Sequence, residues 1–198
     1  AWMRQALAAV GLSDPWLPPA ALVVALLAWQ AIEASDWRFS PACLVGMAAE
    51  SLVLAIALIG LSKLVDLGFM RLEGSASPAT LATGAIHPIA PLIGFLGAGL
   101  YEEALFRLAL VPLGFAVLRL LQVPAVLAST LAVSGSAFLF SMAHHAGAPG
   151  EAFTWFAFIF RWLAGVYFAW VFIVRGFGIA VGTHAAYDIL VGWFDWHL

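Results

Sequence analysis

Most of this chain consists of a succession of apolar stretches, each about as long as a membrane is thick. A helix needs roughly 20 mostly apolar residues to cross a bilayer. Of the 198 residues, 64% are hydrophobic and only 10% are charged, a balance that no soluble core of this length could bury. The sequence therefore predicts an all-α, polytopic transmembrane helix bundle of about 6–7 spans. The candidate spans are about 17–34, 42–62, 123–145, 152–174 and 177–195, with a further apolar region at 81–121.

A single membrane domain is expected over 1–198. Its N-terminal spans cover about 17–66, and the half that carries the polar motifs covers about 90–195. Residues 66–80 contain charges, Gly, Ser and Pro and are expected to form the one substantial loop. The formal net charge of −3 offers no polybasic surface for nucleic acid, and the single cysteine, Cys43, excludes an internal disulfide.

The apolar region 81–121 is compatible with two short spans or with one long helix entered after Pro88 or Pro91. With the N-terminus inside, two spans place most basic residues on one side of the membrane, as the positive-inside rule favours. A single helix from about Leu92 to Leu120 divides the basic residues evenly, and the rule then decides nothing. The choice depends on the polar residues.

The apolar stretches contain charged and imidazole side chains, whose presence at membrane depth needs a structural or functional explanation. On insertion scales a mid-bilayer Asp, Arg or Lys costs about 2.5–3.5 kcal/mol, and such residues usually face a cavity or a partner. The charged and imidazole residues within the apolar stretches are Glu50, Glu102, Glu103, Arg107, Arg119, His144, His145, Arg161, His184 and Asp188. Three groups of residues from this set have the spacing of a helix face.

The first group contains two adjacent carboxylates, Glu102 and Glu103, followed by Arg107. Glu103 and Arg107 are four residues apart, so they share a helix face and can form an ion pair. Glu102 lies about 100° around the helix and has no such partner in sequence. Burial without a paired cation tunes a carboxyl group toward general-base chemistry near neutral pH. An ion pair that only holds two helices together is the alternative.

The second and third groups supply imidazoles. Phe140 and His144 share a helix face, so we expect His144 to lie against an aromatic ring. His145 points about 100° away and is expected to cap the helix. His184 and Asp188 form another i,i+4 polar pair. Each of these residues, taken alone, could be a hydrogen-bonded core residue without a catalytic role.

The expected depths of these residues favour a shared site. If one long helix begins near Leu92, Glu102 lies roughly 15 Å below that face of the membrane. His144 then lies roughly 7 Å below the same face, and His184 and Asp188 lie roughly 12–18 Å below it. Two short spans would instead leave Glu102 at the surface. We therefore predict the long helix and a single polar layer inside the bundle.

In this order the three motifs resemble those of the CPBP family, the CAAX prenyl protease and bacteriocin-processing (Abi) proteins. The motifs are Glu102-Glu103-x-x-x-Arg107, Phe140-x-x-x-His144 and His184-x-x-x-Asp188, within about 90–195. The resemblance implies an all-helical membrane bundle with an intramembrane polar cavity and a glutamate-type peptidase activity. Members cleave prenylated proteins, process bacteriocins or sorting tags, or confer immunity. Nothing in the sequence selects among these substrates.

The resemblance also implies a role for each motif. Glu102 with His144 would activate the attacking water. Glu103 and Arg107 would hold their helix and its charge.

His184 and Asp188 would help to stabilise the tetrahedral oxyanion, and Phe140 would support the site. The last motif position is often Asn in this family, and an ionised Asp cannot donate a hydrogen bond. Asp188 would have to be protonated, orient His184 or pair with a cation.

Two other functions remain open. A zinc peptidase could use Glu102, His144 and His184 as ligands, since catalytic zinc takes three protein ligands plus water, although an H-E-x-x-H helix is absent. A non-catalytic membrane protein, such as a proton-coupled transporter, a chaperone or an immunity factor, could use the same residues as a proton relay. The peptidase interpretation predicts no cofactor, a membrane-associated protein or peptide as substrate, the lipid bilayer as surroundings and no nucleic-acid partner. It also predicts a multi-pass protein of a bacterial or archaeal inner membrane, with the cavity toward the cytoplasm.

Overall fold

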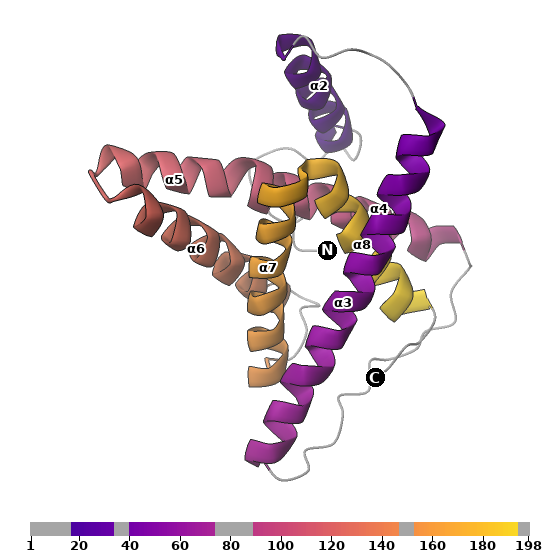
Figure 1. The fold of residues 1–198 in the computed structure, drawn as a ribbon, viewed down its shortest axis with the longest axis vertical. Helices are drawn as coiled ribbons and strands as arrows, with labels where there is room; N and C mark the ends of the chain where they lie inside the picture. Colours follow the sequence, from indigo (N-terminus) through magenta and orange to yellow (C-terminus); the bar gives the residue numbers. More distant parts are fainter. Residues whose placement is uncertain (1–16, 34–39, 74–88, 147–152, 194–198) are drawn as a thin grey trace.

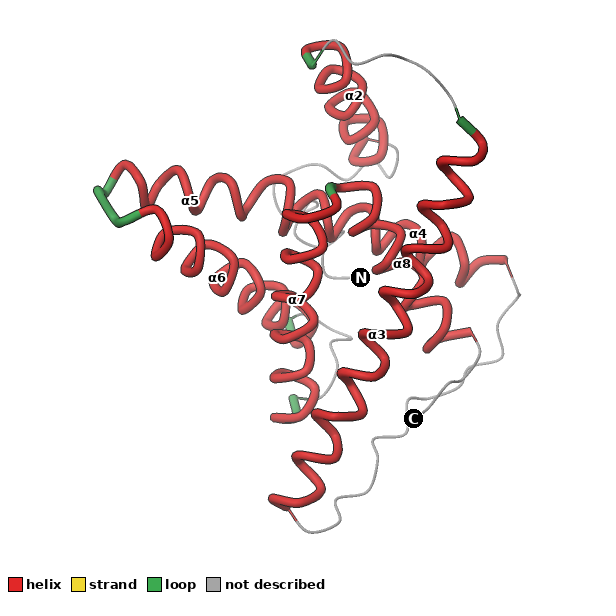
Figure 2. Tube along the Cα trace, viewed as in Figure 1, coloured by secondary structure: helices red, strands yellow, loops and turns green. Residues whose placement is uncertain are grey.

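The computed structural model is helical throughout the residues it describes, which are 17–33, 40–73, 89–146 and 153–193 (Figures 1 and 2). These ranges contain no strand, so the predicted all-α fold is confirmed. The elements are α2 (Leu17–Ile32), α3 (Pro41–Glu73), α4 (Ile89–Glu103), the π-helix η1 (Ala104–Leu110), α5 (Val111–Leu120), α6 (Ala125–His145), α7 (Trp155–Arg175) and α8 (Phe177–Trp193).

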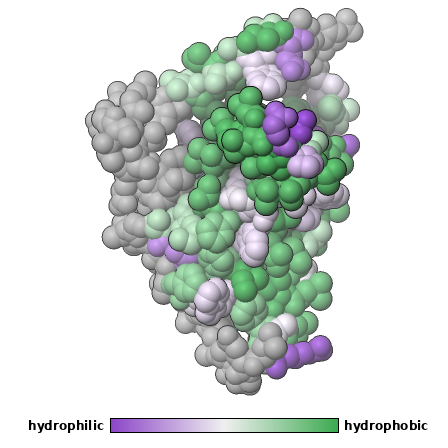
Figure 3. All heavy atoms as spheres, turned by 90° about the vertical axis from the view of Figure 1, so that its left-hand side faces the viewer, coloured by the Kyte–Doolittle hydropathy of each residue, from purple (hydrophilic) through white to green (hydrophobic). Residues whose placement is uncertain are grey.

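The outside of the bundle is suited to lipid. Three of the described helices are long and apolar enough to cross a membrane, over Pro41–Arg71, Ala125–His145 and Trp155–Arg175, and two shorter apolar helices cover Ala20–Ile32 and Phe177–Gly192. Figure 3 shows a face that is mostly hydrophobic, with hydrophilic residues in small separate groups. Apolar surface exposed on this scale is typical of a membrane-embedded protein. The predicted transmembrane bundle is confirmed.

Helix α3 is longer than the sequence predicted. The second span was expected to end near Asp66, with a loop over 66–80, but the helix continues to Glu73. Residues 74–80 of the expected loop lie outside the described residues. Charges near a helix end can reach the membrane surface, so they need not end the helix. Phe69 in the added turns packs edge-on against Phe156 of α7, with ring centroids 5.8 Å apart. This contact ties the extension to the bundle.

The region 89–120 is one continuous helix, as the depths of the polar residues predicted. Helices α4, η1 and α5 follow one another without a break, and the middle segment is π-helical. Pro112 explains why the helix widens here, because proline lacks an N–H and its ring clashes with the carbonyl four residues earlier. Ser136 of α6 donates a 2.6 Å hydrogen bond to the carbonyl of Phe106 within this π turn. The widened turn is thereby anchored to the neighbouring helix.

Helices α7 and α8 organise the bundle. Helix α8 packs against α3, α4 and α7, and α6 packs against α5, η1 and α7. Helices α5 and α6 form a hairpin that projects to the left in Figure 1. Gln122 makes the turn with φ 63°, and Arg119 donates a 2.7 Å hydrogen bond to the carbonyl of Val123. The charge of Arg119 therefore lies at the tip of the hairpin.

Glycines allow the closest helix contacts. A Cβ at Gly165 of α7 would lie 2.8 Å from the Cβ of Ala137 on α6, and one at Gly99 of α4 would lie 3.0 Å from the amide nitrogen of Ala185 on α8. Small residues at such crossings let two backbones approach closely in membrane bundles. These two contacts set the α6–α7 and α4–α8 separations, and with them the spacing of the side chains in the interior.

Glu50, one of the membrane-depth charges, has its partner on another helix. Both Nε and Nη2 of Arg175, the last residue of α7, donate to its carboxylate, and the Nη2–Oε2 distance is 2.7 Å. The side chains are 32% and 51% exposed. This ion pair joins α3 to α7.

Candidate active site

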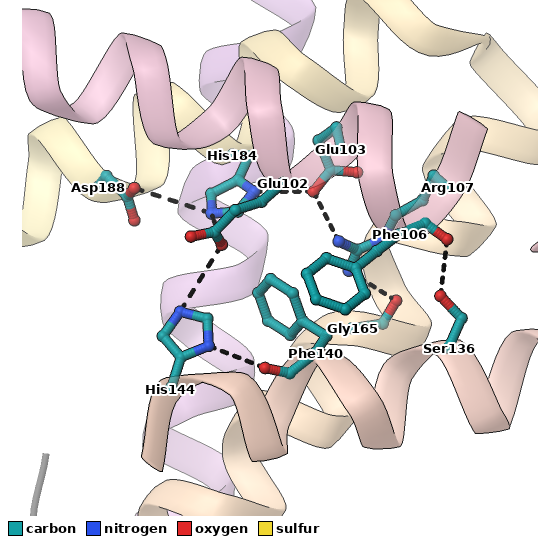
Figure 4. Close-up of polar contacts among 10 residues, drawn as sticks. All are labelled: Glu102, Glu103, Phe106, Arg107, Ser136, Phe140, His144, Gly165, His184 and Asp188. Atoms are coloured by element: carbon teal, nitrogen blue, oxygen red, sulfur yellow. Dashed lines mark hydrogen bonds and ion pairs between the residues drawn. The ribbon is translucent and has the colours of Figure 1, made fainter. Parts of the chain in front are cut away.

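The residues of the three sequence motifs lie together inside the bundle (Figure 4). They come from three continuous helical segments that meet in the interior, which are α4–η1, α6 and α8. The structure therefore brings together every predicted site residue, although their spacing in the sequence is large. The residues are Glu102, Glu103, Arg107, Phe140, His144, His184 and Asp188.

Glu103 is fully buried and holds two partners with one oxygen. Its Oε1 lies 3.0 Å from Arg107 Nη1 and 2.7 Å from His184 Nδ1. The ion pair with Arg107 is the i,i+4 contact that the sequence predicted. The contact with His184 was not predicted. A carboxylate can only accept, so His184 donates through Nδ1 and its Nε2 faces the other way.

Arg107 is 1% exposed and is surrounded by acceptors and ring faces. Its Nη2 donates to the carbonyl of Gly165 at 3.1 Å. Its Cζ lies 4.5 Å from the ring centroid of Phe140 and 5.3 Å from that of Phe168. A buried cation is tolerated only when it is paired and hydrogen-bonded, and aromatic faces add further stabilisation. The guanidinium is therefore held by groups from three helices, which are α4, α6 and α7.

Glu102 is the carboxylate on which the two imidazoles converge. Its Oε2 lies 3.6 Å from His144 Nε2 and 3.8 Å from His184 Nε2. These distances are longer than a hydrogen bond, yet short enough for one water molecule to contact Glu102 and an imidazole at once. His144 Nδ1 lies 2.8 Å from the carbonyl of Phe140, which fixes Nδ1 as the donor. Both histidines are therefore held through Nδ1 and present Nε2 to Glu102.

Asp188 lies at the more open side of the cluster. Its Oδ2 is 3.7 Å from His184 Nε2, and its side chain is 24% exposed. The predicted i,i+4 neighbours are thus close, but their separation exceeds a direct hydrogen bond. His184 has its short contact with Glu103 instead.

His144 and His145 occupy different surroundings. The ring of His144 lies against Phe140, with centroids 4.8 Å apart, as the shared helix face predicted. His145 packs against Phe153 and Phe158, with centroid distances of 5.2 Å and 6.2 Å. Of these two rings, it is His144 whose Nε2 lies 3.6 Å from the carboxylate of Glu102.

The residues named as possible zinc ligands are Glu102, His144 and His184, and the structure places them near one another. Within the described part of the chain, however, no group of three or more His, Cys, Asp or Glu side chains is arranged to hold a metal ion.

Two residues of α7 contribute to the site without having been predicted. The carbonyl of Gly165 accepts from Arg107, and the ring of Phe168 stacks on His184. Helix α7 contains many aromatic residues, so no sequence pattern distinguished Phe168 from the others. A glycine in this run of large side chains was the only signal for Gly165.

The fold and the site define a class of protein, namely membrane-embedded helical proteins with a buried cluster of carboxylates and imidazoles. Residues 84–190, just over half of the chain, match the family model described as type II CAAX prenyl endopeptidase Rce1-like, and the chain belongs to this family. The matched range contains all three motifs, so the resemblance stated from the sequence is confirmed. Family membership makes the protein a membrane peptidase of the CAAX protease type. Searches of curated proteins and of solved structures found no match.

Proposed function

We propose that this chain is an intramembrane endopeptidase that hydrolyses a peptide bond of a membrane-associated protein, using water activated by Glu102 and His144. The observation that carries the proposal is the convergence of two Nε2 atoms on Glu102 Oε2, at 3.6 Å and 3.8 Å, inside an apolar bundle. The family name points to prenylated proteins that end in a CAAX sequence as the substrate class.

The site can supply each proton transfer that peptide hydrolysis requires. Glu102 accepts a proton from water while the water oxygen attacks the scissile carbonyl carbon, and His144 Nε2 orients the same water. The carbonyl oxygen becomes an oxyanion, to which His184 donates from Nε2 when its ring carries both protons. As the carbon–nitrogen bond breaks, Glu102 passes its proton to the leaving amine.

In this proposal Asp188 orients the imidazole of His184. An ionised carboxylate cannot donate to an oxyanion, and Asp188 Oδ2 lies 3.7 Å from His184 Nε2. Its side chain is 24% exposed, which supports a position beside the water or substrate that would reach His184 in this proposal.

The proposed surroundings are a bacterial or archaeal inner membrane, with the site open to the cytoplasm. If each continuous helix crosses the membrane and the N-terminus is inside, the end of α6 lies on the cytoplasmic side. The test is a Cys43→Ser protein that carries Ala146→Cys, an exposed position at the end of α6. A membrane-impermeant thiol reagent should label it from the cytoplasmic side, and labelling only from the opposite side would reverse this orientation.

The decisive experiment on the mechanism is Glu102→Gln, assayed in detergent with an internally quenched, prenylated peptide that ends in CAAX. We expect wild-type protein to cleave the peptide and Glu102→Gln to lose turnover. The melting temperature should stay the same or rise slightly, because the substitution removes the cost of desolvating a buried carboxylate whose contacts with the imidazoles are longer than a hydrogen bond. Glu50→Gln is the matched control, since this carboxylate lies outside the site.

Near-wild-type turnover by Glu102→Gln would exclude a glutamate base. If wild-type activity disappears with a chelator and returns with zinc, the zinc mechanism replaces it. Wild-type protein without activity on this peptide would contradict the proposed substrate class.

A further inference from the structure

We propose that Phe168 is a positioning residue that fixes the plane of the His184 imidazole, so that Nε2 stays directed at Glu102. The inference rests on the proposed function and adds to it a residue outside the three motifs. Phe168 is 2% exposed, and its ring lies nearly parallel to that of His184, with centroids 4.5 Å apart and an interplanar angle of 12°.

A single hydrogen bond does not fix an imidazole ring. The contact between His184 Nδ1 and Glu103 Oε1 still tolerates some rotation of the ring about its Cβ–Cγ bond, because a hydrogen bond weakens only gradually as it bends. Phe168 covers one face of the imidazole and blocks that rotation, and Phe140 approaches it edge-on at 5.8 Å and 72°. The hydrogen bond and the two rings together determine where Nε2 points.

Phe168 is itself held by the core of the bundle. It packs in a buried cluster with Leu58 of α3 and Phe160 of α7. The guanidinium of Arg107 lies 5.3 Å from the centroid of its ring. One rigid side chain therefore connects the core to His184 and to Arg107. Residues locked by packing in this way hold a catalytic geometry more accurately than residues held by a single polar contact.

The test compares Phe168→Leu with Phe160→Leu. Phe160 is a matched control because it belongs to the same helix and the same cluster, while its ring contacts are Phe156 and Tyr187. Both variants should lose similar thermal stability. On the prenylated CAAX peptide, Phe168→Leu should lower kcat by about 10–100-fold, the effect of a misplaced catalytic group, and should leave KM within about twofold. Phe160→Leu should keep its kcat.

Equal losses of kcat in the two variants would overturn the proposal. If Phe168→Leu does not fold, Phe168→Met takes its place, since the flexible methionine side chain fills a similar volume without a ring face.

A second measurement needs no substrate. Nitrogen-15 NMR of the imidazoles in detergent, with His184→Asn to assign the signal, should show one His184 ring state protonated at Nδ1. Phe168→Leu should give an exchange-averaged signal, and Phe160→Leu should match the wild type. An unchanged His184 signal in Phe168→Leu would contradict the proposal even if the peptide is cleaved. Wild-type protein that gives the expected spectra but cleaves nothing would contradict only the proposed function.

Discussion

Glu103 Oε1 and His184 Nδ1 lie 2.7 Å apart, although the two residues are 81 positions apart in the sequence. The same oxygen holds Arg107 at 3.0 Å. Glu103 therefore does more than neutralise an arginine on its own helix, because it also sets the tautomer and the position of an imidazole on α8. This arrangement resembles the use of a buried aspartate to orient the histidine of a catalytic triad.

Glu103→Gln should damage both folding and activity. The amide removes the charge that compensates Arg107, and stranding one member of a buried ion pair typically costs about 3–5 kcal/mol. Thermal unfolding in detergent and turnover of the CAAX peptide measure the two effects. Glu50→Gln, which disrupts a partly exposed pair, should change stability much less than Glu103→Gln does. A Glu103→Gln protein as stable and active as the wild type would show that the pair is not needed.

Arg107→Lys should destabilise the protein although it keeps the charge. Lysine is a point donor that cannot span Glu103 and the carbonyl of Gly165 as the guanidinium does. Loss of a hydrogen bond to a charged group costs about 1.5–3 kcal/mol, so the melting temperature and the yield of folded protein should fall. Arg175→Lys, at the exposed pair with Glu50, is the matched control and should have a small effect. Equal effects of the two lysine substitutions would contradict the role of the Gly165 contact.

His144→Ala and His145→Ala should separate chemistry from packing. His144 Nε2 faces Glu102, so its loss should lower kcat by about 10²-fold, the cost of a misplaced attacking water. His145 packs against Phe153 and Phe158, so its alanine variant should lose some thermal stability and keep its turnover. Melting curves and peptide assays on both variants show which histidine is needed for turnover and which only for stability. Loss of activity only in His145→Ala would reverse the assignment.

Gly165→Ala should destabilise the contact between α6 and α7. The added Cβ would lie 2.8 Å from the Cβ and 2.9 Å from the Cα of Ala137, so the backbone has to shift. Overpacking of this kind typically costs about 1–3 kcal/mol. Gly135→Ala on α6 meets nothing within 4 Å and should instead stabilise the helix by up to about 1 kcal/mol. The difference between the two melting temperatures is the measurement, and equal shifts would contradict the close approach.

The contacts that sequence reasoning predicted are those within one helix. Helical spacing places Glu103 beside Arg107 and Phe140 beside His144, and both contacts are present. The expected depths of the polar residues also selected the continuous helix over 89–120. These predictions succeed because a fixed rise and turn per residue determine them.

The contacts between helices were not predictable in the same way. The hydrogen bond from His184 to Glu103 and the stack on Phe168 depend on crossing angles and on where small residues let helices approach. One sequence does not encode those angles in a local pattern. The predicted end of α3 was wrong for a related reason. The last charged turns of this helix are stabilised by a contact with α7, which the local sequence does not reveal.

The π turn at 104–110 acts as a one-residue insertion in an otherwise regular helix. Relative to an unbroken α-helix, it rotates all of α5 by about 100° with respect to the two carboxylates before it. Gly114 of α5 faces Ala132 of α6, and that alignment holds only with the extra residue present. Deleting one residue from the turn would leave Glu102 and Glu103 in place but swing the α5–α6 hairpin around the axis. The phase of a single turn thus determines whether His144 lies beside the carboxylate of Glu102.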